Sequence, residues 1–216
     1  MKRALALAGL GLAVLALSSC SSGRRSAQFT LDGVTAPPRV CALNPNQFAQ
    51  AERVPDFHES NGCGVTNGYR IYTINDVGLS QSALVTCDLA DAVSGWVANV
   101  VQPMAQSIYG QRVVAIKVAA SYACRARNNK FGAKLSEHGF GNAIDIAAFT
   151  LSDGREVSVL RDYYNGGADG KFLRAIRARA CGLFNTVLGP GSDSNHRDHL
   201  HLDKMFLRKG RGTYCH

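Results

Sequence analysis

Proline is scarce in this sequence, with 6 in 216 residues, and this excludes a proline-rich rod. No internal repeat and no low-complexity tract is visible. No two cysteines form a Cys-x-x-Cys pair, which disfavours a zinc knuckle held by thiolates. Beyond the N-terminal segment about 180 residues remain, enough for one domain with a full hydrophobic core.

The N-terminal apolar run, Ala4 to Leu17, is too short to be a convincing transmembrane helix. It follows Met1-Lys2-Arg3, and a basic start before a short apolar run is typical of a signal peptide. The next residues, Leu17-Ser18-Ser19-Cys20, resemble the bacterial lipobox, whose cysteine is lipidated. We predict a lipoprotein signal peptide over residues 1–19, a lipidated Cys20 with a flexible tether over 20–38, and a domain over 39–216.

The predicted lipid anchor sets the expected location and partners. Ser21 rather than Asp follows Cys20, so the usual signal for retention in the inner membrane is missing. We therefore expect an exported chain anchored in the cell envelope, at the outer membrane facing the periplasm if the source has two membranes. The formal net charge is +8 and the pI is about 9.3. Because no nucleic-acid motif occurs, this charge favours anionic envelope polymers or lipid headgroups rather than nucleic acid.

Six cysteines remain when Cys20 is set aside. Their number is even and an exported protein meets an oxidising compartment, so we predict three disulfides. The sequence leaves the pairing open. The cysteines concerned are Cys41, Cys63, Cys87, Cys124, Cys181 and Cys215.

Four of the six histidines lie in two short segments. The first segment holds His138 and Asp145, with glycines between them that allow the chain to turn. The second segment holds His196, His199 and His201. Catalytic zinc is usually held by three nitrogen or oxygen ligands, with the fourth position left for water. The two segments therefore predict a zinc site, with two ligands from the first and one from the second.

The second segment has the alternation of a strand. If residues 199–203 are extended, His199, His201 and Asp203 lie on one face, while the two leucines between them face the core. One imidazole can then bind a metal while its neighbour acts on the substrate.

The hydrophobic pattern predicts an α+β fold. We expect a single disulfide-stabilised domain in which helices flank a small antiparallel sheet that carries the zinc site. Residues 79–84 are expected to be a connection, and Pro103 to kink the first helix or end its regular part. The expected strands cover Tyr69–Ile74, Arg112–Tyr122, Ala143–Phe149, Val157–Val159 and His199–Leu202, and the expected helices cover Asp88–Tyr109 and Gly170–Cys181.

These motifs resemble those of known families. The pattern Ser136-x-His138-x-x-Gly141-x-Ala143-x-Asp145, with His199-x-His201, resembles the zinc site of lysostaphin-type endopeptidases, D-Ala-D-Ala metallopeptidases and the hedgehog signalling domain. Within that group the chain resembles the bacterial extensin-like C-terminal domain, from about Cys41 to the end. The residues that carry this resemblance are Cys63-Gly-Val65, Ser121-Tyr-Ala-Cys124-Arg125, Leu135-Ser-Glu-His138, Leu188-Gly-Pro190-Gly-Ser-Asp193 and His196-x-x-His199-x-His201.

The resemblance implies a role for each site residue. His199 matches a histidine that acts as general base or steadies the tetrahedral intermediate, and His196 resembles an extra active-site histidine of murein endopeptidases. D-Ala-D-Ala dipeptidases place an acidic residue three positions before the last ligand, which is Asp198 here, so His199 and Asp198 compete as base. The residues that match the metal ligands are His138, Asp145 and His201.

Arg125 is a further candidate. Its segment resembles one whose arginine contacts the scissile carbonyl or a substrate carboxylate in the dipeptidases. The planar guanidinium can hold an oxyanion with two charge-assisted hydrogen bonds. Arg127 competes with it, and a solvated cation with no role is the alternative for Arg125.

Two functions follow as expectations. The first is a zinc metallopeptidase that hydrolyses peptide bonds in the stem peptides or crosslinks of peptidoglycan. The second is a zinc-containing module that binds peptidoglycan or another envelope component without hydrolysis. The sequence does not distinguish an endopeptidase from a carboxypeptidase.

Overall fold

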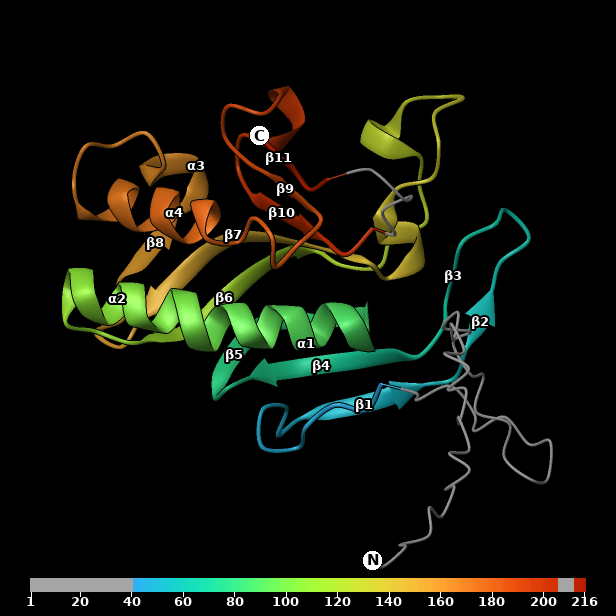
Figure 1. Ribbon diagram of the computed structural model, residues 1–216, viewed down its shortest axis with the longest axis horizontal. Helices are drawn as coiled ribbons and strands as arrows, with labels where there is room; N and C mark the ends of the chain where they lie inside the picture. The colour runs from blue at the N-terminus through green and yellow to red at the C-terminus, as the bar shows by residue number, and fades with distance from the viewer. Residues whose placement is uncertain (1–40, 206–211) are drawn as a thin grey trace, which may run out of the picture. The chain divides into compact units, whose positions relative to one another are not determined.

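One large sheet organises the residues that the computed structural model describes, 41–205 and 212–216 (Figure 1). Its strands are β1 (Ala51–Val54), β4 (Gly68–Ile74), β5 (Val77–Thr86), β6 (Val113–Ala120), β7 (Ala143–Leu151), β8 (Glu156–Ser158), β9 (Thr186–Leu188), β10 (Leu200–Asp203) and β11 (Tyr214–Cys215). They follow the order β1-β4-β5-β6-β7-β10-β9-β11, and β8 pairs with β7. The pairs β5–β6 and β9–β11 are parallel, and the other pairs are antiparallel. A separate hairpin joins β2 (Phe57–His58) to β3 (Gly64–Val65).

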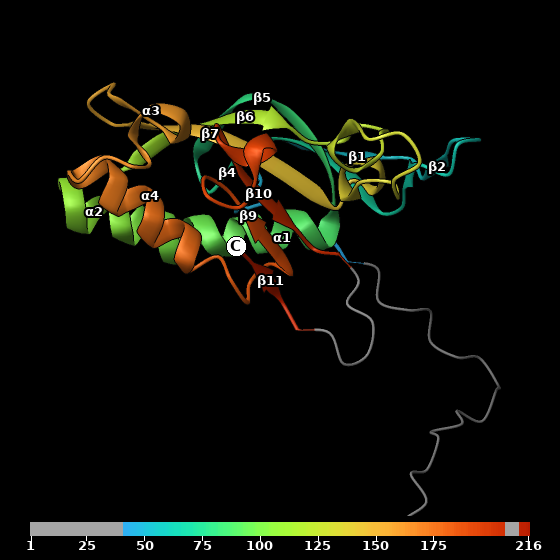
Figure 2. The same ribbon diagram turned by 90° about the horizontal axis from the view of Figure 1, so that it is seen from above.

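Helices cover one face of this sheet. The first helical stretch consists of α1 (Cys87–Trp96), the π-helical segment η1 (Val97–Val101) and α2 (Gln102–Tyr109). Together with α4 (Ala168–Ala178) it packs below the sheet in Figure 2, while the short α3 (Val159–Asp162) follows β8. Three short 3-10 turns complete the set: η2 (Arg127–Asn129), η3 (Glu137–Phe140) and η4 (Ser194–His196).

The core lies between the sheet and these helices. Trp96 is fully buried, and its ring packs edge-on against Phe149 and Phe184. Its indole nitrogen donates a hydrogen bond of 3.0 Å to the carbonyl of Ile176. Burying a large apolar side chain of this kind stabilises a fold by about 1.5–3 kcal/mol. Trp96, the single tryptophan of the sequence, is therefore a core residue.

The sheet is larger than the sequence predicts. The expected small antiparallel sheet is wrong in size, since nine strands join it over the described residues, and two of its pairings are parallel. The α+β class and the five expected strands are confirmed, in β4, β6, β7, β8 and β10. The additional strands are β1, β5, β9 and β11, and most of these are short.

Residues 79–84, expected to be a connection, belong to the long strand β5. Their Ser-Gln-Ser centre has the polarity of a turn. In the structure these polar side chains replace part of the backbone hydrogen-bond ladder to β6. The Ser80 hydroxyl accepts a hydrogen bond of 3.1 Å from the Val118 backbone amide, and the Gln81 side-chain amide donates one of 2.9 Å to the Val118 carbonyl. Direct backbone pairing of β5 with β6 covers only two registered residue pairs. Side-chain hydrogen bonds thus let a polar sequence continue a strand.

The first predicted helix has the expected extent but not a regular course. The α-helical part ends at Trp96, and a π-helical turn precedes α2, which carries Pro103 in its first turn. Proline lacks an amide hydrogen, so it is tolerated at a helix start but not in a regular interior. Gly110 ends α2 in the left-handed conformation, with φ of +67°. The regular α-helix is therefore interrupted before Pro103, by the π-helical turn Val97–Val101, and α-helix resumes around the proline itself.

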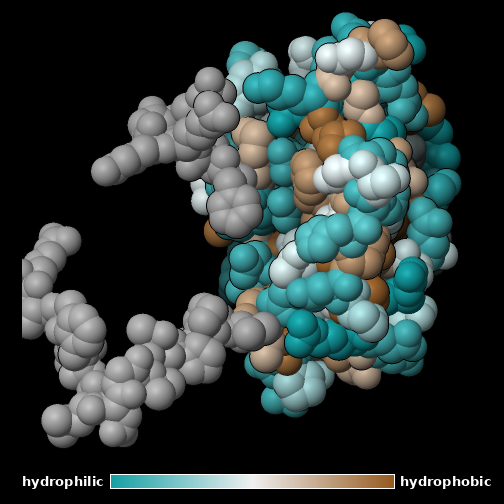
Figure 3. All heavy atoms as spheres, turned by 90° about the vertical axis from the view of Figure 1, so that its right-hand side faces the viewer, coloured by the Kyte–Doolittle hydropathy of each residue, from teal (hydrophilic) through white to brown (hydrophobic). Residues whose placement is uncertain are grey.

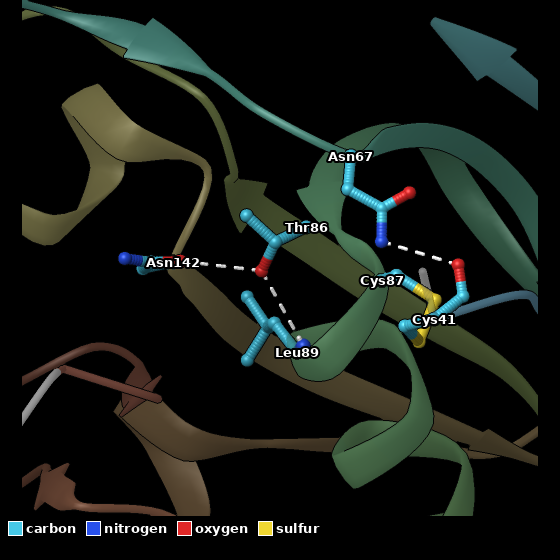
Figure 4. The surroundings of a disulfide bond; sticks show 6 residues. All are labelled: Cys41, Asn67, Thr86, Cys87, Leu89 and Asn142. Carbon is cyan, nitrogen blue, oxygen red and sulfur yellow. Dashed lines mark hydrogen bonds between the residues drawn. A yellow bond between two sulfur atoms is a disulfide. The ribbon is translucent and has the colours of Figure 1, made fainter. Parts of the chain in front are cut away.

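Three disulfides cross-link the domain, as predicted. They join Cys41 to Cys87, Cys63 to Cys124, and Cys181 to Cys215. Figure 4 shows the first bridge at the start of α1, where the Asn67 side chain also donates a hydrogen bond of 3.1 Å to the Cys41 carbonyl.

The predicted signal peptide, Cys20 and the tether over residues 20–38 lie outside the described residues. In the described part of the chain, no helix combines the length and apolar character that crossing a membrane requires.

The three bridges predict a specific peptide map. Proteolysis of the full chain without reduction should release the three cross-linked pairs seen in the structure, and thiol labelling after denaturation should leave these six cysteines unmodified. The bridges close loops with sequence separations of 34 to 61 residues. Replacing one pair, Cys63 and Cys124, by alanine should therefore lower the free energy of unfolding by about 4 kcal/mol in urea titrations. A different set of cross-linked peptides would contradict the arrangement.

Candidate metal centre

The pairing of β7 with β10 brings two of the predicted ligands together. In this antiparallel pair His201 lies directly opposite Asp145. Directly opposed residues point to the same face of a sheet, so their side chains meet. The His201 Nδ1 atom lies 2.8 Å from Asp145 Oδ1, and both residues are buried.

The third predicted ligand, His138, lies on the turn η3 that precedes β7. The turn closes through backbone bonds from the Gly139 amide to the Ser136 carbonyl, and from the Gly141 amide to the His138 carbonyl. Gly141 has φ of +66°, a conformation that side chains disfavour. A Cβ atom on Gly139 would lie 2.8 Å from the Cys63 sulfur, so the bridge to Cys124 packs directly against the turn.

The turn is also tied to the start of α1, as Figure 4 shows. The Thr86 hydroxyl donates to the Asn142 side chain at 3.2 Å and accepts from the Leu89 amide as the N-cap of α1. The Thr86 amide donates to the Gly141 carbonyl at 2.8 Å. The residues on both sides of Gly141 are therefore held by the helix start on one side and the Cys63–Cys124 bridge on the other.

His138, Asp145 and His201 form a compact group of donor atoms. One donor atom from each residue lies within 4.8 Å of the others. His138 Nε2 lies 3.1 Å from Asp145 Oδ2 and 3.2 Å from His201 Nδ1. Ligands about 2.0–2.1 Å from a tetrahedral zinc ion lie about 3.3 Å from each other. The spacing of the three donors thus fits a zinc ion.

Hydrogen-bond partners on the outer side of the His138 and His201 rings leave the inner ring nitrogens available to bind a metal. The other nitrogen of His138, Nδ1, lies 2.6 Å from the Ser121 carbonyl, which can only accept a hydrogen bond. His201 Nε2 lies 3.2 Å from an Asp203 carboxylate oxygen. With a metal between them, each ring would place its N–H on the outer side and its lone pair toward the centre, which is the arrangement that metal-binding histidines usually have.

The charge of the group also favours a cation. Asp145 and Asp203 are buried, and over the described residues their ion-pair partners are histidines and not Lys or Arg. Burial raises the pKa of Asp145, but hydrogen bonds from His138 and His201 outweigh this and lower it. Burial lowers the pKa of His201, but hydrogen bonds to Asp145 and Asp203 raise it to about 9. Two buried carboxylates need positive charge beside them, and a divalent cation between neutral imidazoles supplies it.

His199 lies beside the group without being one of its three donors. Its Nε2 atom is 3.6 Å from Asp145 Oδ1, and its side chain is 15% exposed. Its Nδ1 atom lies 2.8 Å from Asp198, whose side chain is 64% exposed. Asp198 thus orients His199 and points its own carboxylate away from the buried donors. This one hydrogen bond joins His199 and Asp198, the two residues that the sequence leaves as competing candidates for the base.

His196 closes the other side of the site. Its ring lies 5.2 Å from that of His199 and 5.6 Å from that of His201, centroid to centroid. Asp193 holds its Nδ1 atom at 2.8 Å. Burial lowers the pKa of His196, and the hydrogen bond to Asp193 only partly offsets this. The neutral imidazole is therefore favoured at neutral pH.

A cavity of about 570 Å³ opens onto the donors, and its lining includes His138, His201 and His196 together with Arg125 and Arg127. Over the described residues the Arg125 guanidinium has no ion-pair partner. Arg127 pairs with Glu137 at 3.3 Å. A second cavity, of about 840 Å³, shares Glu137 and Met205 with the first.

The structure thus brings Arg125, His138, His196 and His201 together around one cavity. Asp145, His199 and Asp198 are linked to this group by side-chain contacts, and Cys20 lies outside the described residues. The strand alternation of residues 199–203 places Asp203 on the site face but assigns it no role. Its position two residues after His201 in a strand was the available signal. No signal in the sequence could have indicated the role of the Ser121 carbonyl, because any residue at that place offers the same backbone oxygen.

Comparison with protein families gives one further finding. Residues 39–216 match the family described as the extensin-like protein C-terminus. Comparisons with curated proteins and with solved structures found no match. The matched range includes the three donors, the neighbouring histidines and the six bridged cysteines. The chain therefore belongs to the extensin-like C-terminal family.

Proposed function

We propose that this chain is a zinc-dependent peptidase that hydrolyses peptide bonds in the stem peptides or crosslinks of peptidoglycan. The observation that carries the proposal is the convergence of His138, Asp145 and His201, with one ring nitrogen of each imidazole and a carboxylate oxygen directed to one point. Three protein ligands leave one tetrahedral position open, which is the arrangement of catalytic rather than structural zinc.

The donor set favours zinc over other common ions. Two imidazoles and one carboxylate suit zinc, whereas calcium and magnesium prefer oxygen ligands. When bound, zinc supplies a Lewis acid and lowers the pKa of a water molecule to near neutrality. Asp203 and the Ser121 carbonyl would hold the two histidine ligands in the required tautomers.

His199 is the proposed general base. Asp198 accepts a hydrogen bond from the Nδ1 atom of His199, so the Nε2 atom of His199 carries the free lone pair. That atom faces Asp145 at 3.6 Å, at the edge of the donor group, and can take a proton there. Asp198 is accordingly a positioning residue, and its exposure makes it a weaker candidate for the base.

Arg125 is proposed to stabilise the oxyanion of the reacting amide, and His196 is the alternative. Both line the cavity that contains the donors. A guanidinium without a protein partner is available for a substrate oxygen. The neutral imidazole of His196 donates through whichever nitrogen carries its hydrogen, and Asp193 fixes that hydrogen on Nδ1. Arg125 is therefore the stronger candidate of the two.

Four features support peptidoglycan as the substrate. The site residues resemble those of the zinc peptidases of peptidoglycan. The basic chain favours an anionic envelope polymer. The lipobox-like sequence before Cys20 implies export and a lipid anchor. Two adjacent cavities leave room for a substrate longer than a dipeptide.

Zinc binding tests the first step. The full chain should bind about one equivalent of zinc, and His138→Ala should bind far less, because one of three donors is lost. His58→Ala is the matched control, since His58 is an exposed histidine on β2 outside the donor group. Metal analysis after dialysis measures the stoichiometry. Zinc at about one hundred times its Kd should also stabilise the wild-type fold by about 2.7 kcal/mol.

Equal zinc content in wild type and His138→Ala would contradict the assignment. Loss of zinc from His58→Ala to the same degree would also contradict it, because a general loss of structure would then explain both results.

Hydrolysis tests the second step. His199→Ala should keep its zinc and fold, because His199 is not one of the three donors, but its turnover should fall by about a hundredfold or more. Asp198→Ala should lose less, because it only orients the base. The measurement is digestion of purified sacculi by the zinc-loaded chain, followed by mass analysis of the released muropeptides.

Two outcomes would change the proposal. If Asp198→Ala abolishes turnover and His199→Ala only weakens it, Asp198 is the base. If zinc-loaded wild type binds sacculi and defined crosslinked muropeptides but releases no product, a zinc-containing binding module is the better description.

A further inference from the structure

Residues 125–134 form a basic loop at the rim of the metal cavity, called the basic finger below. The finger contains Arg125, Arg127, Lys130 and Lys134 and no acidic residue. Figure 1 shows it as the yellow-green loop at the upper right, beyond the ends of β6 and β7. Figure 3 views this end of the domain, where hydrophilic residues cover most of the visible surface.

The finger carries one large apolar side chain at its tip. Phe131 has a relative exposure of 107%, against 74% for Tyr164, the next most exposed large hydrophobic residue in the described part of the chain. Lys130 and Lys134 are also exposed. A phenylalanine held fully in water contributes nothing to the core, and an exposed aromatic with cations beside it is typical of a binding surface.

Backbone hydrogen bonds join the two sides of the finger. The Arg127 amide donates to the Lys134 carbonyl at 2.9 Å, and the Ser136 amide donates to the Arg125 carbonyl at 3.0 Å. The turn residues Asn128 and Gly132 have φ of +54° and +74°, values that asparagine and glycine tolerate well. These contacts hold the finger as a hairpin-like loop that presents Phe131 at its tip.

The base of the finger is fixed beside the donors. The Cys63–Cys124 bridge ends one residue before the finger, and Arg127 pairs with Glu137, the neighbour of His138. Arg125, Arg127 and Asn128 line the same cavity as His138 and His201. A molecule held by the finger is therefore held next to the proposed catalytic site.

We propose that the basic finger binds the glycan-peptide polymer of the cell wall and positions its stem peptide for entry into the cavity. The Phe131 ring packs against the apolar face of a sugar, and Lys130 and Lys134 attract the carboxylates of the polymer. The choice of this polymer rests on the proposed function. An anionic membrane surface also suits cations and an aromatic ring. A flat bilayer, however, cannot enter the cavity that the base of the finger lines.

Binding to purified sacculi tests the inference. All variants are made in the full chain with Cys20→Ser, which removes the proposed lipid anchor, and their affinity is measured by co-sedimentation. Phe131→Ala should weaken binding by about tenfold or more, since burying such a ring contributes about that much. Lys130→Gln with Lys134→Gln should weaken binding and reduce its dependence on salt.

Matched controls come from the opposite end of the sheet. Leu160→Ala removes an apolar side chain that is 64% exposed on α3, and Lys171→Gln removes an exposed cation on α4. Both elements lie away from the finger in Figures 1 and 2. These variants should bind sacculi within about twofold of wild type. Unfolding curves of the finger variants should match that of wild type.

The outcomes separate this inference from the proposed function. If the finger variants bind sacculi as tightly as wild type, the inference is wrong, whether or not wild type releases muropeptides. If they bind more weakly while zinc-loaded wild type releases no product, the finger is a binding surface and only the proposed hydrolysis fails. If Phe131→Ala loses affinity for vesicles of phosphatidylglycerol and phosphatidylcholine but not for sacculi, the partner is a membrane and the inference is wrong.

Discussion

The register between β7 and β10 is the constraint on which the candidate metal centre depends. It places His201 directly opposite Asp145 and puts both side chains on the face that His138 approaches. Side chains alternate along a strand, so a slip of one residue would turn His201 toward the core and bring a leucine into the site. The hydrophobic neighbours Leu200 and Leu202 are fully buried and resist such a slip. The same packing that stabilises the sheet therefore fixes the geometry of the donors.

The rest of the site lies on segments with little regular structure, and covalent and side-chain links hold them in place. The turn that carries His138 is supported by the Cys63–Cys124 bridge on one side. On the other side, Thr86 connects the start of α1 to the residues that follow Gly141. A disulfide can fix a segment of this kind covalently where regular secondary structure does not. The segments that carry His138 and the basic finger are thus held from their ends.

The donor residues could be predicted from sequence because their spacing and the strand alternation point to the same chemistry. The strands around them were predictable for the same reason, since alternation is strongest where one face is buried. The size of the sheet was not, because Ser80 and Gln81 read as a turn and become strand residues only through bonds to β6. The disulfide pairing could not be predicted from the sequence either, since it depends on which segments the fold brings together. The orienting contacts of Ser121 and Asp198 follow from three-dimensional placement alone.

Charge is arranged around the proposed site in two layers, and this explains how one basic chain can suit both a metal cation and an anionic polymer. The buried layer is acidic, since it holds the carboxylates of Asp145 and Asp203 beside the ring of His201. The outer layer is basic, with Arg125 on the cavity wall and the lysines of the finger beyond it. Solvent and salt screen the outer cations far more than the buried carboxylates. The outer layer is therefore suited to attract the proposed polymer from a distance, while the inner layer is suited to the proposed cation at short range, and the two do not neutralise each other.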